Sequence, residues 1–174
     1  MRLILSAICC LALCSISVLA EKAKAPMSDQ KFLDTAAQTD MIEANLGQLA
    51  QDAASGQPVK DYGRMLVTDH TQDYQALQSL AEQTGLTVPT AINAAHNHAM
   101  ITPMHALKGA AFDHKYIQAM VQGHTEALAL YKKEAKDAEN PAIRSYAEQT
   151  IPTLQKHLDA ARAIEQGKTP SNKS

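Results

Sequence analysis

The sequence has few aromatic residues and no tryptophan: aromatics make up 4% of its 174 residues. It also has no block of basic residues, and its formal net charge is −2, which excludes the strongly positive surface typical of nucleic-acid binding. Glycine and proline number seven each, too few for a collagen-like chain or a linker. Hydrophobic residues, by contrast, make up 45%, which indicates a chain that folds around a core.

Cysteine is confined to the first twenty residues, where the three in the chain are Cys9, Cys10 and Cys14. This segment begins with Arg2, continues as an apolar run and ends in Val-Leu-Ala, the pattern of a cleaved secretory signal peptide. Two alternatives fit less well. The apolar run is short for a membrane anchor, and a lipoprotein signal needs a small residue where Leu13 precedes Cys14. We therefore predict a signal peptide over residues 1–20 and a periplasmic location.

Cleavage after Ala20 would remove 20 of the 174 residues and leave 154 without any cysteine. It would also remove one of the 16 basic residues and none of the 18 acidic ones, so the net charge becomes −3. A cysteine-free chain suits an oxidising compartment, and it excludes disulfides, thiolate metal ligands and cysteine nucleophiles. We expect no stable membrane insertion after cleavage, because no long apolar segment remains.

Four segments show apolar residues at spacings of three and four, which is the period of an amphipathic helix. Each would be roughly 40 Å long at about 1.5 Å per residue. Ser28 can cap the first, Pro58 suits the start of the second, and Gly85 suits its end. Four long helices of similar length predict an all-α fold, a ferritin-like four-helix bundle. The segments cover approximately residues 29–55, 58–84, 112–138 and 141–166.

The connection over residues 86–111 is too long for a plain loop, and it predicts a crossover that travels the length of the bundle between the second and third helices. Within it, residues 90–100 are compatible with a short helix that stops before Pro103. Pro152 lies inside the fourth helical segment, where we expect a kink or a loosened turn. The domain organisation follows: a flexible lead over 21–27, the bundle over 28–167 and a polar tail over 168–174.

Each apolar stripe carries one residue of metal-ligand type near its middle: Glu43, His70, His124 and His157. With the crossover in place, the four lie within about 4.5 Å of one level, given a rise of about 1.5 Å per residue. A buried carboxylate needs a partner or a metal, because an isolated buried charge is very costly. Three imidazoles and one carboxylate suit one ion of zinc, iron, manganese or copper.

A metal-free reading of the same residues is a hydrogen-bonded network in which one imidazolium offsets Glu43. Asp40 and Asp73 lie one turn from Glu43 and His70 and are candidates for hydrogen bonds to imidazole N–H groups. Three glycines inside the helices either make room for the site or allow close helix packing, and we favour packing. A second, weaker copper candidate lies in the crossover. The glycines are Gly47, Gly63 and Gly123, and the crossover residues are His96, His98, Met100, Met104 and His105.

Several short motifs follow one another along nearly the whole chain after residue 20. They are Phe32-Leu33, Ile42-Glu43, Val59-Lys60, Met65-Leu-Val-Thr-Asp69-His70, Gly85-Leu-Thr-Val-Pro89, Phe112-Asp113 and Leu154 with His157-Leu158. In order and spacing they resemble the domain-of-unknown-function 4142 family, secreted bacterial proteins assigned to the ferritin-like helical bundles. The resemblance implies the fold and an exported location, and it implies no particular activity.

The likeness to ferritin-like di-iron proteins is at the level of the fold alone. Their sites need glutamate three residues before histidine, and here those positions hold Val67, Val121 and Leu154. Three functions remain open: a periplasmic metal-binding bundle, a metal-free envelope or stress-related binding module, and a metal-dependent oxidoreductase. The sequence has no phosphate-binding loop and no nucleophile elbow, and it specifies neither a protein partner nor an oligomeric state.

Overall fold

The computed structural model describes residues 27–170, and no strand occurs in that part of the chain. The predicted signal peptide over 1–20, the lead up to residue 26 and the end of the polar tail over 171–174 lie outside the described residues.

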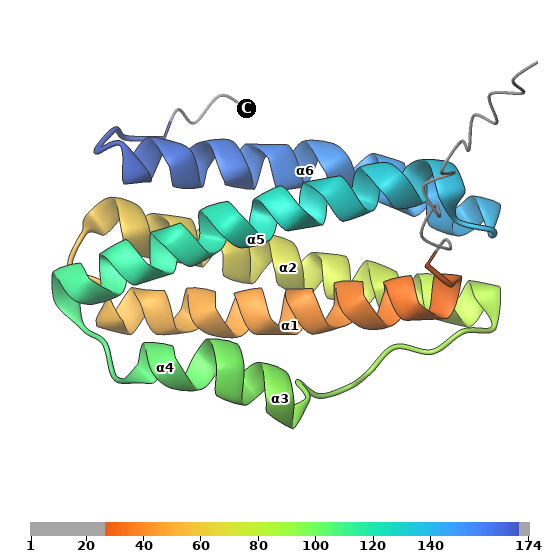
Figure 1. Ribbon diagram of the computed structural model, residues 1–174, viewed down its shortest axis with the longest axis horizontal. Coiled ribbons are helices and arrows are strands. Elements are labelled where there is room, and N and C mark those ends of the chain that lie inside the picture. Colours follow the sequence, from red (N-terminus) through yellow and green to blue (C-terminus); the bar gives the residue numbers. More distant parts are fainter. Residues whose placement is uncertain (1–26, 171–174) are drawn as a thin grey trace, which may run out of the picture.

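Four long helices form the body of the molecule (Figure 1): α1 (Asp29–Ala53), α2 (Gln57–Thr84), α5 (Gly109–Asp137) and α6 (Pro141–Glu165). Tight turns join α1 to α2 and α5 to α6, so each pair is an antiparallel hairpin. The crossover returns the chain along the side of the bundle, and α2 and α5 therefore run in the same direction. The predicted all-α four-helix bundle with a long crossover between its second and third long helices is confirmed.

The helix ends follow local sequence signals. Ser28 caps α1 by accepting a hydrogen bond from the Lys31 amide, and Asn140 caps α6 in the same way through the Ala142 amide. Gly85 ends α2 with φ of 70°, a conformation that glycine adopts without steric cost. The one difference of more than two residues is at α5, which begins at Gly109 rather than near Phe112.

The crossover contains a helical stretch of three consecutive pieces: α3 (Ala94–His96), the π-helical turn η1 (Asn97–Ile101) and α4 (Thr102–His105). The expectation that this helix stops before Pro103 is wrong, because Pro103 lies inside α4. The preceding turn is wide, with the Thr102 amide bonded to the Asn97 carbonyl five residues earlier. Pro103 lies in the first turn of α4, where its missing N–H costs no hydrogen bond of that helix, and the wide π turn before it accommodates the ring. In α6, the helix continues unbroken through Pro152.

The apolar core is divided into two clusters, one toward each end of the bundle. One contains Leu46, Leu66 and Phe112, and the other contains Phe32, Leu77 and Tyr131. On each long helix, one cluster lies before the predicted ligand and the other after it, apart from Ile42 and Leu158, which are directly adjacent to the ligands. The core thus leaves a layer between the two clusters that apolar side chains do not fill.

Close packing of α1 against α2 depends on two glycines. A Cβ added at Gly47 would lie 2.6 Å from the Gly63 carbonyl oxygen, and one added at Gly63 would lie 2.7 Å from the Gly47 carbonyl oxygen. Both distances are far below van der Waals contact, so the two backbones touch where these residues cross. Gly123 differs, because its added Cβ would make only an ordinary contact of 3.5 Å with Glu43 Oε1. Close packing therefore explains Gly47 and Gly63, while Gly123 borders the candidate site.

The two hairpins are joined at both ends by aspartates. Asp113 of α5 accepts hydrogen bonds from the Ser55 amide, the Ser55 hydroxyl and the Gly56 amide at the α1–α2 turn. At the opposite end, Asp29 of α1 accepts from the amides of Glu139 and Asn140 at the α5–α6 turn. Within residues 27–170, no helix combines the length and apolarity that a membrane span requires.

Candidate metal centre

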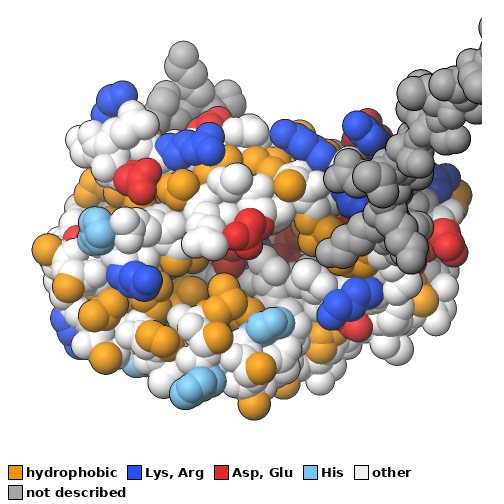
Figure 2. Space-filling view, in the orientation of Figure 1, with side chains coloured by type: hydrophobic (Ala, Val, Ile, Leu, Met, Phe, Trp, Pro, Cys, Tyr) orange, Lys and Arg blue, Asp and Glu red, His pale blue; other side chains and the backbone are white. Residues whose placement is uncertain are grey.

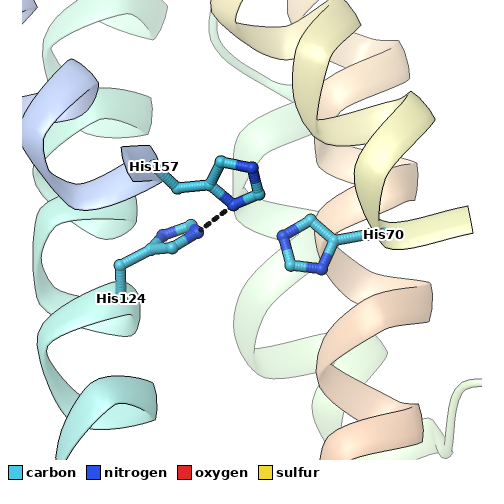
Figure 3. Close-up of side chains that lie close together, drawn as sticks. All are labelled: His70, His124 and His157. Carbon is cyan, nitrogen blue, oxygen red and sulfur yellow. Dashed lines mark hydrogen bonds between the residues drawn. The ribbon is translucent and has the colours of Figure 1, made fainter. Parts of the chain in front are cut away.

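The four predicted ligands meet in the layer between the two apolar clusters. Glu43 comes from α1, His70 from α2, His124 from α5 and His157 from α6, and all four side chains are buried. Figure 3 shows the three imidazole rings pointing toward one another from three different helices. The antiparallel hairpins and the crossover bring the four residues to one level, as their mid-helix positions predicted.

Each imidazole donates a hydrogen bond from its outer nitrogen to a neighbouring oxygen. His70 Nδ1–H donates to Asp40 Oδ1 at 2.8 Å, and His157 Nε2–H donates to Asp69 Oδ2 at 2.8 Å. His124 Nδ1–H donates to the carbonyl oxygen of Met120, one turn earlier on the same helix, at 3.0 Å. The oxygen partners assign the tautomer of each neutral ring.

When the rings are neutral, the inner nitrogens carry lone pairs that face one another. His124 Nε2 lies 3.2 Å from His157 Nδ1 and 3.2 Å from Glu43 Oε2. His70 Nε2 lies 3.0 Å from the same carboxylate oxygen, but neither of these two atoms forms a well-aligned hydrogen bond. Two lone pairs or a lone pair and a carboxylate repel at such distances, so a proton or a cation must lie between them.

Three of the separations between proposed ligand atoms are close to those of a coordination sphere. Metal–nitrogen bonds of about 2.0 Å in a tetrahedral site place neighbouring ligand atoms roughly 3.3 Å apart. Ligand atoms of the three histidines all lie within 4.8 Å of one another, and Glu43 Oε2 is in contact range of two of them. Outer hydrogen bonds to a carboxylate or carbonyl are also the usual support for imidazole ligands of metals. The residues present therefore fit one transition-metal ion.

The charges of the cluster compensate one another when no metal is bound. Burial alone would raise the pKa of Glu43, but the charges of His124, His70 and His157, together with the close contact to His70, bring it below its usual value. Burial alone would lower the pKa of His70, but the charge of Glu43 and the hydrogen bond to Asp40 outweigh that effect and raise it. Burial lowers the pKa of His157, against the opposing effect of Asp69. The metal-free cluster thus holds an anionic Glu43 beside a cationic His70.

Of the two aspartates predicted to contact imidazoles, the structure brings one into place. Asp40 accepts from His70, whereas Asp73 accepts a hydrogen bond of 2.7 Å from the Tyr146 hydroxyl. The prediction for Asp73 is wrong, because the residue faces α6 beside Tyr146 rather than the rings. Sequence reasoning missed Asp69, since it is adjacent to His70 in the sequence and so lies off the apolar stripe of α2.

The histidines and methionines of the crossover form no comparable cluster. His96 Nδ1 contacts the side chains of Asn93 and Gln38, while His98, Met100 and His105 are exposed. Figure 2 shows histidine side chains scattered over the part of the surface that the crossover covers. Among the His, Cys, Asp and Glu residues of 27–170, only the three core histidines form a group that could hold an ion.

A cleft connects the candidate centre with the surface. It has a volume of about 380 Å³, lies between α2 and α6, and includes His70 and His157 in its lining. Asp69, the hydrogen-bond partner of His157, also lines it, and 27% of the Asp69 side chain is exposed.

The family model for a domain of unknown function, DUF4142, matches residues 17–164. The chain belongs to this family. No curated protein matches the sequence.

Solved structures with the same fold include CopM in its Cu(II)-bound form, with a TM-score of 0.68 and 16% sequence identity over 81% of this chain and 97% of that chain. CopM in its Ag-bound and Cu(I)-bound forms gives a TM-score of 0.63 and 15% identity over 82% of this chain and 98% of that chain. At these identities the similarity shows a shared helical fold.

Proposed function

We propose that this protein is an exported helical bundle that binds one transition-metal ion through Glu43, His70, His124 and His157. The observation that carries the proposal is the arrangement of the imidazoles. All three outer nitrogens are hydrogen-bonded to oxygen, and the inner nitrogens converge with 3.2 Å between His124 Nε2 and His157 Nδ1. A bound cation would remove the repulsion between the lone pairs and offset the charge of Glu43.

Copper(II) is the ion we expect to bind most tightly among the divalent candidates. Affinity at sites of nitrogen and oxygen ligands rises from manganese through iron to copper and falls again at zinc. The solved structures of CopM, which has the same fold, are of forms bound to Cu(II), Cu(I) and Ag. Together these two points support a role in binding copper. Zinc, iron and manganese would bind more weakly at the same site.

Export to the periplasm is the second part of the proposal. It is supported by the apolar first twenty residues, which end in a Val-Leu-Ala cleavage pattern, and by the absence of cysteine from the rest of the sequence. Fractionation of cells that express the full chain tests it, together with the mass of the purified protein. Cleavage after Ala20 is expected in the periplasmic fraction, and an uncleaved protein in the cytoplasm would contradict export.

Metal content is the direct test of binding. The purified protein is incubated with one equivalent of Cu²⁺, desalted and measured by mass spectrometry. We expect about one ion per chain for the wild type and a large loss for His70→Ala and His157→Ala, because each variant removes one ligand. His114→Ala is the matched control, since His114 is an exposed histidine of α5 outside the cluster. Equal metal content in all four proteins would show that the core histidines are not ligands.

A metal-free network is the alternative that one observation favours. The opposite charges of Glu43 and His70 compensate each other without an ion. In that case the cluster is a structural ion-pair network in a binding module, and the wild type retains no Cu²⁺ after desalting.

A further inference from the structure

We infer that the cleft between α2 and α6 is the path by which the metal ion enters and leaves, so that the site exchanges its ion instead of enclosing it permanently. This inference rests on the proposed function, since it concerns how the same site is filled. It assigns a role to residues that are not ligands: Asp69, Asp73, Thr153 and Lys156 line the path.

The cleft reaches two of the four proposed ligands directly. His70 and His157 are among its lining residues, although their exposed fractions are only 3% and 1%. They therefore lie at its inner end. Asp69 links this inner end with solvent, because its carboxylate accepts a hydrogen bond from His157 while more than a quarter of its side chain is exposed. A cation that moves along the cleft meets Asp69 before it meets the imidazoles.

The other two proposed ligands, His124 and Glu43, do not line the cleft. His124 is fully buried and Glu43 is 4% exposed. The backbone of α5 at Gly123 covers Glu43, because even an added Cβ there would be in van der Waals contact with Glu43 Oε1. A second groove of about 500 Å³ on α5 is lined by Gln122 and Lys115, and it includes none of the four proposed ligands.

The cleft carries charged side chains of both signs. Two carboxylates, Asp69 and Asp73, line it together with a single basic residue, Lys156. Lys156 is exposed and directly precedes the proposed ligand His157 in α6. Carboxylates attract cations to the path, whereas Lys156 and the cationic His70 of the metal-free cluster oppose their entry. Removing the positive charge of Lys156 should therefore speed entry.

The test is a bulky side chain placed in the cleft away from the ligands. Thr153 is exposed and lines the cleft one turn before His157, so Thr153→Trp should narrow the path. The measured quantities are the rate of Cu²⁺ uptake and the rate of its release to excess chelator, by stopped flow. We expect both rates to fall by about tenfold with an unchanged Kd, because an obstacle raises the barrier in both directions alike.

Gln122→Trp is the matched control, because it places the same side chain in the second groove, and it should leave both rates unchanged. Ala76→Trp narrows the same cleft from α2, so it replaces Thr153→Trp if that variant does not fold, as judged by circular dichroism. Uptake and release at wild-type rates in a folded cleft variant would overturn the inference. Failure of the wild type to retain Cu²⁺ would instead contradict the proposed function, so the two failures are distinguishable.

The charge along the path gives an independent measurement. Lys156→Glu should increase the uptake rate several-fold at low ionic strength, and the gain should shrink as salt screens the charges. Lys115→Glu makes the same change of charge at the second groove and should have little effect. Equal acceleration by both variants would show that only the overall charge matters and would count against this path.

Discussion

The histidines of the centre are held by oxygen atoms that are not themselves candidate ligands. Asp40, Asp69 and the Met120 carbonyl each bind one outer imidazole nitrogen. These contacts orient the rings and select the tautomer that directs a lone pair inward. The affinity of the site should therefore depend on residues beyond the four that we propose as ligands.

Replacing Asp40 tests this dependence. Asp40→Asn keeps the size of the side chain but weakens the acceptor for His70 Nδ1–H. We expect the affinity for Cu²⁺ to fall by about 10- to 100-fold, measured by competition with a chelator of known affinity. Asp73→Asn is the control, because Asp73 accepts a hydrogen bond from Tyr146 and none from an imidazole. An equal loss in both variants would mean that charge, not the hydrogen bond to His70, matters.

At the scale of the helices, α1 and α2 lie unusually close at their two glycines. This contact sets the spacing of the first hairpin and, with it, the relative positions of Glu43 and His70. The second hairpin has no comparable requirement at Gly123, where an added Cβ would fit.

We expect Gly63→Ala to lower the free energy of unfolding by about 1–3 kcal/mol, because the added carbon would lie 2.7 Å from the Gly47 carbonyl oxygen and force the helices apart. Gly123→Ala is the matched control in another helix. It should be neutral or raise stability by up to about 1 kcal/mol, the difference in helix propensity. Urea denaturation measures both free energies of unfolding. A Gly63→Ala variant as stable as the wild type would refute the close contact.

The aspartates that join the two hairpins at their ends should also contribute measurably to the stability of the fold. Asp113→Ala removes the acceptor for three hydrogen bonds at the α1–α2 turn. We expect a loss of about 1–3 kcal/mol in the free energy of unfolding, since the Gly56 amide in this turn is partly buried. Asp159→Ala should change stability by less than about 0.5 kcal/mol, because Asp159 is exposed and bonds only Gln155. Similar losses in both variants would contradict this assignment.

At the scale of the whole molecule, the ion would join the two hairpins. Glu43 and His70 belong to the first hairpin, and His124 and His157 belong to the second. A metal bound to all four stabilises the folded bundle over the unfolded chain, because the complete ligand set exists only when the hairpins are packed together.

Removal of the metal should therefore lower the melting temperature. With free Cu²⁺ at about 100 times Kd, binding contributes about 2.7 kcal/mol, and for a chain of this size each kcal/mol corresponds to roughly 2–4 °C. We expect a decrease of about 5–10 °C on addition of excess chelator, measured by differential scanning calorimetry. His70→Ala should melt at the same temperature with and without Cu²⁺. If the melting temperature of the wild type also did not change with Cu²⁺, a metal bridge between the hairpins would be contradicted.

The sequence by itself determined the four long helices, the crossover and the four polar residues in their apolar stripes. Helical period, caps and breakers act within a few residues, so they can be recognised without knowledge of the rest of the chain. The level at which Glu43, His70, His124 and His157 meet also followed from the sequence, because it depends only on helix lengths and on the direction of each helix.

Only the tertiary structure decided which neighbours support the rings and where the centre opens to solvent. Asp69 and not Asp73 bonds an imidazole, and the cleft lies between α2 and α6. These features depend on how far each helix is rotated about its axis and how closely it packs, which contacts such as that of Gly47 with Gly63 determine across the bundle. The π turn before Pro103 could not be predicted from the local sequence either. The rule for proline, applied alone, predicts that a helix ends there.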